Sequence, residues 1–264
     1  SAIPFFIEKN PSIYTDLIQE LTIFGDKVTV ASIDSSLKPF QIKRTVEKNI
    51  DLIYIGSFQL YNVNILKKGL AIITLPFFMK RAIKKLDISK FDLILYETPP
   101  ITWAGIVNQI KKKNKIKSFL MLKDIFPQNA VDIGLMKKDS LIFNYFKRKE
   151  ELLYEVSDYI GCMSKGNIEY IIKNNSKIPK EKLYYFPNTK KDTGNGNIDF
   201  EKRKLQFVYG GNMGLPQGVL NIAPAISYFK NEEDIELFNF NELCSQIYRI
   251  KSSYINIGYP IIKK

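Results

Sequence analysis

The chain of 264 residues contains no histidine and only two cysteines, and these absences narrow its chemistry. Without histidine there can be no Ser-His-Asp triad, no histidine general base and no histidine-ligated metal. The cysteines, Cys162 and Cys244, lie far apart and in no metal-ligand spacing, which argues against a zinc site and a disulfide framework. The composition therefore points away from triad hydrolases and zinc-dependent proteins.

Long hydrophobic runs are also missing. The longest apolar stretch, 69–79 (GLAIITLPFFM), is interrupted by Pro76 and is far shorter than the ~20 residues of a membrane-spanning helix. The first residues, SAIPFFIEKN, lack a basic segment followed by an apolar core, so the sequence predicts no secretory signal. We therefore expect a cytoplasmic chain whose contact with the membrane is peripheral.

Positive charge is in excess. Lysine and arginine number 39 against 27 acidic residues, which gives a formal net charge of +12. Such a balance favours a polyanionic partner, either a nucleic acid, an anionic membrane or a phosphorylated substrate. The segment 66–86 has apolar residues with cations at both ends, a composition typical of interfacial membrane binding. The alternative is that its apolar residues face a sheet and its lysines are solvated.

Strand-like and helical segments alternate along the first part of the chain. Apolar runs at 27–33, 50–55, 91–96, 117–122, 159–162 and 182–186 predict strands, and amphipathic stretches at 12–24, 67–86, 101–110, 141–156 and 166–174 predict helices. This alternation predicts an α/β fold, an open parallel sheet with helices on both faces. Ligands in such folds bind beyond the carboxyl ends of strands, near Thr98, Lys123, Asp124 and Ser164.

A polar, Gly/Asn-rich stretch at 188–200 has no periodicity, so we expect one domain at 1–200 and a second at 201–264. After it, a strand predicted at 205–209 runs into the turn 210–218 (GGNMGLPQG) and a helical stretch. Glycines let a backbone approach an anion and a helix N-terminus offers free N–H groups, so this turn could bind phosphate. A simple tight turn is the alternative, because the Walker pattern and the GxGxxG spacing are both absent.

Four motifs follow one another along the chain: KDIFPQNAVDIG at 123–134, SDYIGCMSKGNIEYI at 157–171, FPNT at 186–189 and FVYGGNMGLPQG at 207–218. Together they resemble bacterial glycosyltransferases of the large family-4 group, and above all its capsule and O-antigen subgroup of L-fucosamine transferase-like proteins. The segment 10–21 (NPSIYTDLIQEL) is also similar to that subgroup. The resemblance covers residues 3–230 and implies the GT-B architecture, in which two Rossmann-like domains face each other across a cleft.

The resemblance implies that residues 1–200 bind the acceptor and that residues 201–264 form part of a nucleotide-sugar-binding domain. Family members are longer, and 253–262 (SYINIGYPII) resembles a late piece of their second domain, so we expect that domain to be incomplete here. Many relatives carry Glu-x7-Glu before a Gly-x-Pro, whereas Ser245 and Ser253 occupy those positions in this chain. The stereochemical outcome of transfer is therefore left open.

The resemblance also implies functional residues. The donor-side candidates, at the turn that binds the diphosphate in family members, are Gly211, Asn212, Gly214 and Gln217. N–H groups and cations stabilise the departing diphosphate, so we expect no metal and no cofactor beyond the nucleotide-sugar substrate. Asp124 could accept a proton from an acceptor hydroxyl or orient a sugar, and Lys123 could contact phosphate. The alternative is that Asp124 only caps the turn before Phe126.

Four further residues are acceptor-side candidates: Ser12, Tyr14, Thr98 and Trp103. Ser12 and Tyr14 lie at the start of the first predicted helix, near the cleft by analogy with the family. Trp103 could stack on a sugar, although a lone aromatic residue on a helix belongs more often to the core. These residues are predicted to contact the molecule that receives the sugar.

Together these features predict a glycosyltransferase of surface-polysaccharide assembly. It would move a sugar from a UDP-linked donor to an undecaprenyl-linked or saccharide acceptor at the anionic inner face of the plasma membrane, with no nucleic-acid partner. Two alternatives remain open. One is an inactive or truncated scaffold that binds a partner enzyme, and the other is a basic nucleic-acid-binding α/β protein, although RNP, KH, helix-turn-helix and zinc signatures are absent.

Overall fold

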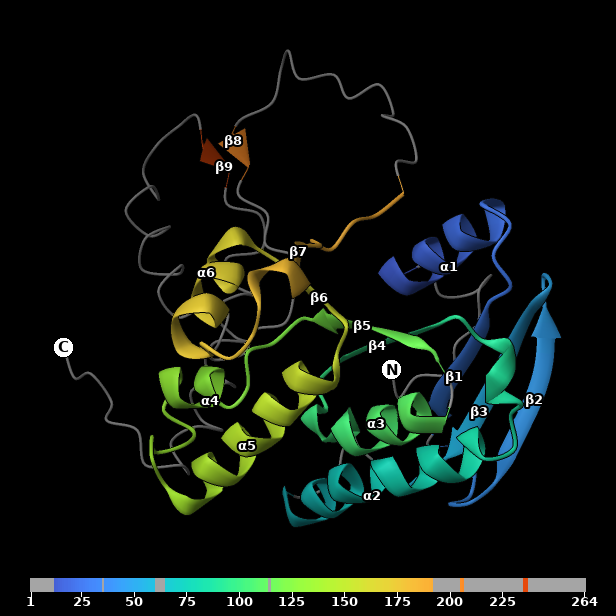
Figure 1. Cartoon of the computed structure of the whole chain (residues 1–264), viewed down its shortest axis with the longest axis horizontal. Coiled ribbons are helices and arrows are strands. Elements are labelled where there is room, and N and C mark those ends of the chain that lie inside the picture. Colours follow the sequence, from blue (N-terminus) through green and yellow to red (C-terminus); the bar gives the residue numbers. More distant parts are fainter. Residues whose placement is uncertain are drawn as a thin grey trace. The chain divides into compact units, whose positions relative to one another are not determined.

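The computed structural model describes residues 12–34, 36–59, 65–113, 115–191, 205–206 and 235–236. The chain divides into two units, residues 1–192 and 193–264 (Figure 1). The division falls inside the polar stretch at 188–200. In the second unit the described strands are β8 (Leu205–Gln206) and β9 (Ile235–Glu236), which pair in parallel.

The first unit alternates strands with helices, as its sequence predicts. Its strands are β1 (Thr29–Asp34), β2 (Ile42–Glu47), β3 (Ile50–Gly56), β4 (Leu93–Thr98), β5 (Lys117–Leu122), β6 (Tyr159–Cys162) and β7 (Leu183–Tyr185). Its helices are α1 (Ile13–Ile23), α2 (Ile65–Ile83), α3 (Ala104–Lys113), α4 (Gln128–Asp132), α5 (Leu141–Val156) and α6 (Lys165–Asn174). Short 3-10 turns are η1 (Ile88–Lys90), η2 (Ile101–Trp103) and η3 (Lys180–Lys182).

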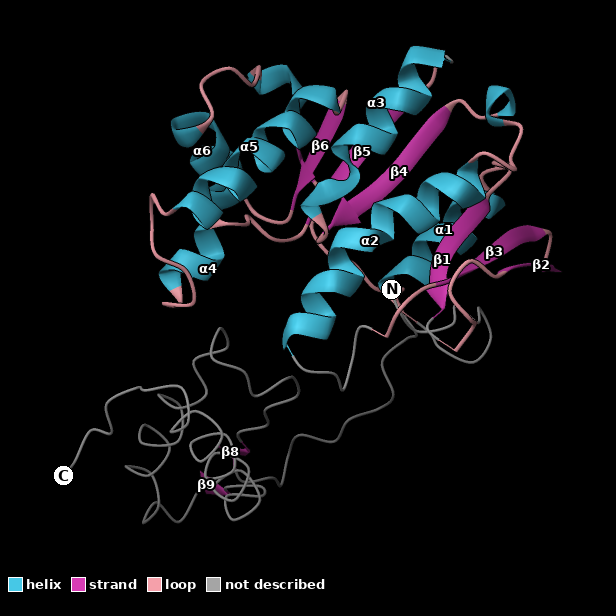
Figure 2. Ribbon diagram, turned by 90° about the horizontal axis from the view of Figure 1, so that it is seen from below, coloured by secondary structure: helices cyan, strands magenta, loops and turns pink. Residues whose placement is uncertain are grey.

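The strands of this unit form two sheets (Figure 2). Their strand orders are β1-β3-β2 and β4-β5-β6-β7. Among the described strands, pairings are parallel except between β2 and β3, which are antiparallel. The predicted parallel pairing is present in both sheets, and β2 adds an antiparallel edge strand that the sequence did not predict. A two-residue turn at Lys48 and Asn49, with φ of 48° and 63°, joins β2 to β3. Positive φ at both positions is typical of such hairpin turns.

Strand β3 shows how the first sheet is covered on both faces. Ile50, Leu52 and Tyr54 pack in the cluster that includes Ile18 of α1, whereas Ile53 packs in the cluster that α2 supplies. These strand residues are all buried. Because successive side chains of a strand point to opposite faces, a near-continuous apolar strand is what a sheet covered on both sides requires.

The second sheet has its main core where β5 and β6 meet helices α5 and α6. Leu120, Leu122, Ile160, Leu153 and Ile171 are all at most 1% exposed in this cluster. Burying a leucine or isoleucine side chain contributes about 1.5–3 kcal/mol. The core therefore holds β5 and β6, and with them the segments that follow their carboxyl ends, in fixed positions.

Helix α2 takes up most of the helical stretch predicted at 67–86. Its residues Leu75, Phe78 and Ala82 are buried against the first sheet, whereas Phe77 and Arg81 are exposed. This division favours the interpretation that most of its described apolar side chains belong to the core, rather than to a helix lying flat on lipid. Within the described ranges, no helix combines the length and the hydropathy needed to cross a bilayer.

Candidate functional site

Three polar side chains meet where strands β4 and β5 end. Tyr14 comes from the first turn of α1, Glu97 lies near the end of β4, and Lys123 follows β5 directly. The Tyr14 hydroxyl donates a hydrogen bond to Glu97 Oε2 and accepts one from Lys123 Nζ. Lys123 Nζ also forms an ion pair with Glu97 Oε2 at 3.3 Å and lies 3.9 Å from the centre of the Tyr14 ring. We call these residues the carboxyl-edge cluster.

The carboxyl-edge cluster is partly buried and holds its charges in place. The side chains of Lys123 and Glu97 are 17% and 23% exposed. Burial, together with the hydrogen bond to Glu97, raises the pKa of Tyr14 far above its usual range, so the phenol stays protonated and is no base. An ammonium group has three N–H donors, and Tyr14 and Glu97 use two of those on Lys123. Within the described part of the chain no partner takes the third donor, which leaves it open to a ligand.

Asp124 follows the cluster and is exposed at the same edge of the sheet. Partial desolvation of its carboxyl group raises the pKa of Asp124 above its ordinary value, while the charge of Lys123 lowers it. A carboxylate with a raised pKa that still reaches solvent is suited to accept a proton from a hydroxyl group. The edge therefore combines a fixed cation with a carboxylate that can act as a base.

Thr98 ties the ends of β4 and β5 together. Its side chain is buried, and its hydroxyl accepts a hydrogen bond from Lys123 N at 3.2 Å and donates one to Asp124 O at 3.5 Å. Because this hydroxyl is engaged by the main chain, Thr98 positions Lys123 and Asp124. A contact between Thr98 and an acceptor stays a prediction.

Ser12 and Trp103 have structural partners. Ser12 is the N-cap of α1, because its hydroxyl accepts a hydrogen bond from Thr15 N at 3.3 Å while Thr15 Oγ1 accepts one from Ser12 N at 2.7 Å. Trp103 is half-buried in η2 and packs against three hydrophobic clusters. These contacts favour a capping role for Ser12 and the core interpretation of Trp103, and their acceptor contacts stay predictions.

The predicted donor-side residues lie outside the described part of the chain: Gly211, Asn212, Gly214 and Gln217, and with them Ser245 and Ser253. The structure thus brings Tyr14, Thr98, Lys123 and Asp124 to one edge of the sheet. Among the described residues, no group of three cysteine or acidic side chains comes together in a way that could hold a metal ion.

Glu97 is the member of the carboxyl-edge cluster that sequence analysis did not single out. A signal was present, since Glu97 is a lone carboxylate after the apolar run FDLILY. Its partners were not visible, because Tyr14 lies 83 residues away in the sequence. A charged residue near the end of an apolar strand, next to a predicted ligand-binding edge, would have been the criterion that found it.

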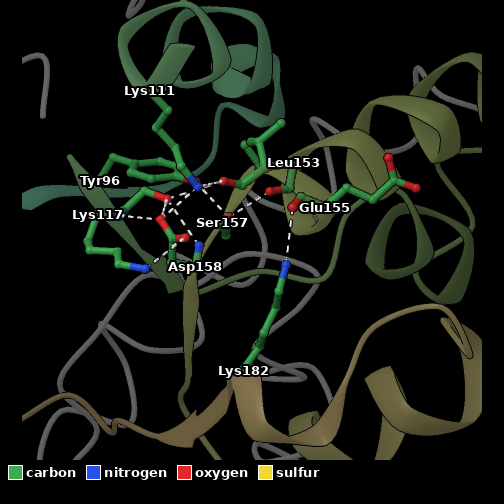
Figure 3. Close-up of polar contacts among 10 residues, drawn as sticks. Tyr96, Lys111, Lys117, Leu153, Glu155, Ser157, Asp158 and Lys182 are labelled. Atoms are coloured by element: carbon green, nitrogen blue, oxygen red, sulfur yellow. Dashed lines mark hydrogen bonds and ion pairs between the residues drawn. The ribbon is translucent and has the colours of Figure 1, made fainter. Parts of the chain in front are cut away.

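A second lysine–carboxylate cluster lies at the opposite, amino-terminal edge of the same sheet (Figure 3). Asp158 Oδ2 accepts hydrogen bonds from Lys111 Nζ at 2.6 Å and from Ser118 N and Oγ at 2.8 and 2.9 Å. Burial by itself would raise the pKa of Asp158, but the hydrogen bonds from Lys111 and Ser118 outweigh it, so the pKa is lowered. We call Lys111, Ser118 and Asp158 the amino-edge cluster.

Comparison with curated proteins finds relatives that include a glycosyltransferase, while no protein-family profile matches the chain. The chain is 28% identical over 151 residues to the probable glycosyltransferase WbjE of Pseudomonas aeruginosa. This match covers 54% of the chain and 38% of WbjE. It is 24% identical over 239 residues to Protein CapK of Staphylococcus aureus. That match covers 85% of this chain and 52% of CapK.

A third match is close but short. The chain is 91% identical over 34 residues to the tRNA(Met) cytidine acetate ligase of Fusobacterium nucleatum, a match that covers 13% of this chain and 9% of the ligase. Such a small share of either protein carries no argument about the fold or the activity of this chain. The chain spans about half or less of the length of these curated relatives.

Two solved structures resemble the chain over most of its length. One structure was reported with bisubstrate glycomimetics of trehalose-6-phosphate synthase. It has a TM-score of 0.52 and is 12% identical to this chain, and the match covers 92% of this chain and 68% of that one. The other is the apo structure of OtsA, with a TM-score of 0.54 and 11% identity. That match covers 94% of this chain and 68% of the OtsA chain. At such identities the likeness shows the fold alone. The chain therefore has an α/β fold of the GT-B type.

Proposed function

We propose that this chain is part of a glycosyltransferase that moves a sugar from a nucleotide-sugar, UDP-linked, to a lipid-linked or saccharide acceptor. The observation that carries the proposal is the carboxyl edge of the second sheet, where the fixed cation Lys123 lies beside the exposed carboxylate Asp124. Ligands of open α/β sheets bind at that edge. The similarity to WbjE over 54% of the chain supports this class of reaction.

In this proposal Lys123 stabilises the leaving group. Negative charge develops on the diphosphate as the bond to the sugar breaks, and a preorganised cation lowers the energy of that state. Lys123 is preorganised because Glu97 and Tyr14 hold its ammonium group and leave one N–H for a phosphate oxygen. The other phosphate contacts are proposed for the turn residues Gly211, Asn212, Gly214 and Gln217.

Asp124 is proposed to act on the acceptor. Its carboxylate accepts the proton of the attacking hydroxyl, or holds that hydroxyl in the orientation for attack. The raised pKa of Asp124 makes it a stronger base than an ordinary surface aspartate. Thr98 holds the main chain of Lys123 and Asp124, so both groups are placed before substrate binds.

We also propose that the reaction belongs to surface-polysaccharide assembly, with an undecaprenyl-linked acceptor at the inner face of the plasma membrane. The resemblance of the sequence motifs to the capsule and O-antigen subgroup supports this setting, and so does the net charge of +12.

Thermal-shift measurements with UDP-, GDP- and CMP-sugars test the proposed function. One nucleotide series should stabilise the protein, by about 2.7 kcal/mol when the ligand is present at 100 times its Kd. Lys123→Gln should weaken that response, whereas the control Lys177→Gln, at an exposed lysine after α6, should not. No response to any nucleotide-sugar would contradict the proposal and favour the scaffold. Retention on heparin without a nucleotide response would favour nucleic-acid binding.

A further inference from the structure

Three phenylalanine rings gather on the surface beside helix α2. Phe40, Phe58 and Phe77 are 49%, 42% and 57% exposed. They come from three segments: the turn between β1 and β2, the residues after β3, and α2. Phe40 and Phe58 pack edge-on against Phe78, with ring centres 5.0 and 5.6 Å apart, and the Phe40 and Phe77 ring centres are 6.0 Å apart. Phe78 itself is buried. We call Phe40, Phe58 and Phe77 the aromatic patch.

The backbone holds Phe40 at the surface at a conformational cost. Its φ is 72°, in the left-handed region that residues with a side chain rarely adopt. Gln41 N donates a hydrogen bond to Lys38 O at 3.0 Å and Gly56 N donates one to Gln41 O at 2.8 Å. A Cβ atom on Gly56 would lie 2.0 Å from Lys38 O, so the turn can approach β3 this closely only because residue 56 is glycine.

Strain of this kind persists where the surrounding structure holds it, and it is found most often at functional sites. Here the strained residue presents an apolar ring to solvent. Burial of the ring does not account for the strain, because about half of Phe40 remains exposed. The turn therefore keeps an apolar group outside the core.

Cations accompany the aromatic patch, and acidic residues are missing from the two segments that supply Phe40 and Phe77. Residues 36–44 and 65–86 contain no aspartate or glutamate. The guanidinium carbon of Arg81 lies 5.8 Å from the centre of the Phe40 ring. Further exposed cations on the same segments are Lys38, Lys80, Lys84 and Lys85. Arg81 thus lies beside the aromatic patch, and the segments that supply Phe40 and Phe77 carry further exposed cations.

We propose that the aromatic patch docks this protein on an anionic phospholipid surface. Phenylalanine rings favour the boundary between headgroups and acyl chains, and lysine and arginine side chains around them attract anionic headgroups. These rings pack edge-on against one another, with interplanar angles between 68° and 84°, so they form no parallel platform on which successive nucleic-acid bases could stack. The inference rests on the proposed function in one respect, since docking would bring the protein to a lipid-linked acceptor. Binding to the lipid surface itself requires no sugar donor.

Co-sedimentation of the full chain with vesicles tests this proposal. The protein should bind vesicles of phosphatidylcholine mixed with phosphatidylglycerol, bind pure phosphatidylcholine weakly, and dissociate at high salt. Phe40→Asn with Phe77→Ser should weaken binding at least about ten-fold, since two rings no longer enter the interface. Asparagine tolerates positive φ, so this variant adds no backbone strain. Lys80→Gln with Arg81→Gln should weaken binding roughly 25-fold, because about 1 kcal/mol is lost per cation.

Matched control variants separate docking from general surface effects. Phe24→Ser removes an aromatic side chain that is 84% exposed at the end of α1, and Lys177→Gln with Lys180→Gln removes two exposed lysines. Both controls should bind vesicles like the unchanged protein, and all variants should keep its unfolding midpoint. The proposal is overturned if the unchanged protein ignores anionic vesicles at low salt, or if patch and control variants bind alike. Displacement from vesicles by a single-stranded oligonucleotide would point instead to a nucleic-acid partner.

The vesicle experiment contains no nucleotide-sugar, so its outcome is independent of sugar transfer. Binding to vesicles without any response to nucleotide-sugars would support the docking surface and contradict the proposed function. A response to a nucleotide-sugar without vesicle binding would support the proposed function and contradict the docking surface.

Discussion

The two edges of the β4-β5-β6-β7 sheet carry clusters of similar chemistry with different surroundings. At the amino edge, Asp158 is bound by Lys111 and by both the main chain and side chain of Ser118, and Lys111 also donates to Val156 O at 2.6 Å. At the carboxyl edge, Lys123 is held by two side chains and keeps a donor for a ligand, beside the exposed Asp124.

The difference shows that a lysine–carboxylate pair does not by itself mark a functional site. The amino-edge cluster joins α3, β5 and the segment between α5 and β6, so its hydrogen bonds hold elements together. The carboxyl-edge cluster lies where parallel sheets bind ligands. Substitutions at the carboxyl edge should therefore affect activity, and those at the amino edge should affect stability.

Asp124→Asn should have the largest effect. Loss of a general base lowers the rate roughly 100- to 10,000-fold, and we expect kcat for sugar transfer to fall in that range while the unfolding midpoint stays unchanged. The measurement is transfer of a labelled sugar from the donor that thermal shift identifies. Asp139→Asn is the matched control, since Asp139 is exposed with a φ of 60° that asparagine tolerates. Equal rates for both variants would exclude Asp124 from the chemistry.

Lys123→Gln should lower kcat roughly 100- to 1,000-fold, because one charge contact to the leaving group is lost. This variant also removes the ion pair between Lys123 and the partly buried Glu97. The double variant Lys123→Gln with Glu97→Gln replaces both charges of that ion pair with neutral amides, and it should not recover activity. Recovery of activity in the double variant would mean that Lys123 acts only on the structure. Lys111→Gln, at the amino edge, should keep its kcat per folded molecule.

Asp158→Asn should lower the free energy of unfolding by about 1–3 kcal/mol at neutral pH, with no change in kcat per folded molecule. The folded-state pKa of Asp158 is lowered, so its carboxylate stabilises the fold above its ordinary pKa of 3.8. That contribution is lost as the pH falls through the folded-state value. Urea unfolding at several pH values should therefore show the two proteins converging in acid. A constant difference across pH would contradict this account.

Ser12→Ala should have the smallest effect, a loss of about 1 kcal/mol of stability from the missing N-cap. Ser12→Asp keeps a capping oxygen and should retain most of that stability. Comparing KM for the acceptor in the two variants tests the predicted acceptor contact. If Ser12→Asp is stable but has a raised acceptor KM, the serine hydroxyl contacts the acceptor as well as the helix.

Much of the fold could be predicted from local patterns. Strands 117–122 and 159–162 and helix 141–156 have the predicted bounds, because each is an apolar run or an amphipathic stretch bounded by polar residues. Strand β2 escaped prediction. Its sequence IKRTVE has only half-buried and exposed positions at a sheet edge, so it lacks the apolar run of a core strand. The positive φ of Lys48 and Asn49 that creates its hairpin leaves only a weak trace in the sequence.

The absence of histidine, read from the sequence alone, excluded a triad, a histidine base and a histidine-ligated metal, and the excess of lysine favoured a polyanionic partner. The order of strands also placed Lys123 and Asp124 at a ligand-binding edge, because strand ends follow from local hydrophobicity. Only the tertiary structure decided that Glu97 and Tyr14 hold Lys123, that three separate segments supply the aromatic patch, and that Asp158 joins the elements of the opposite edge. Such contacts depend on residues far apart in the chain, and their geometry arises only when the packed core brings those segments together.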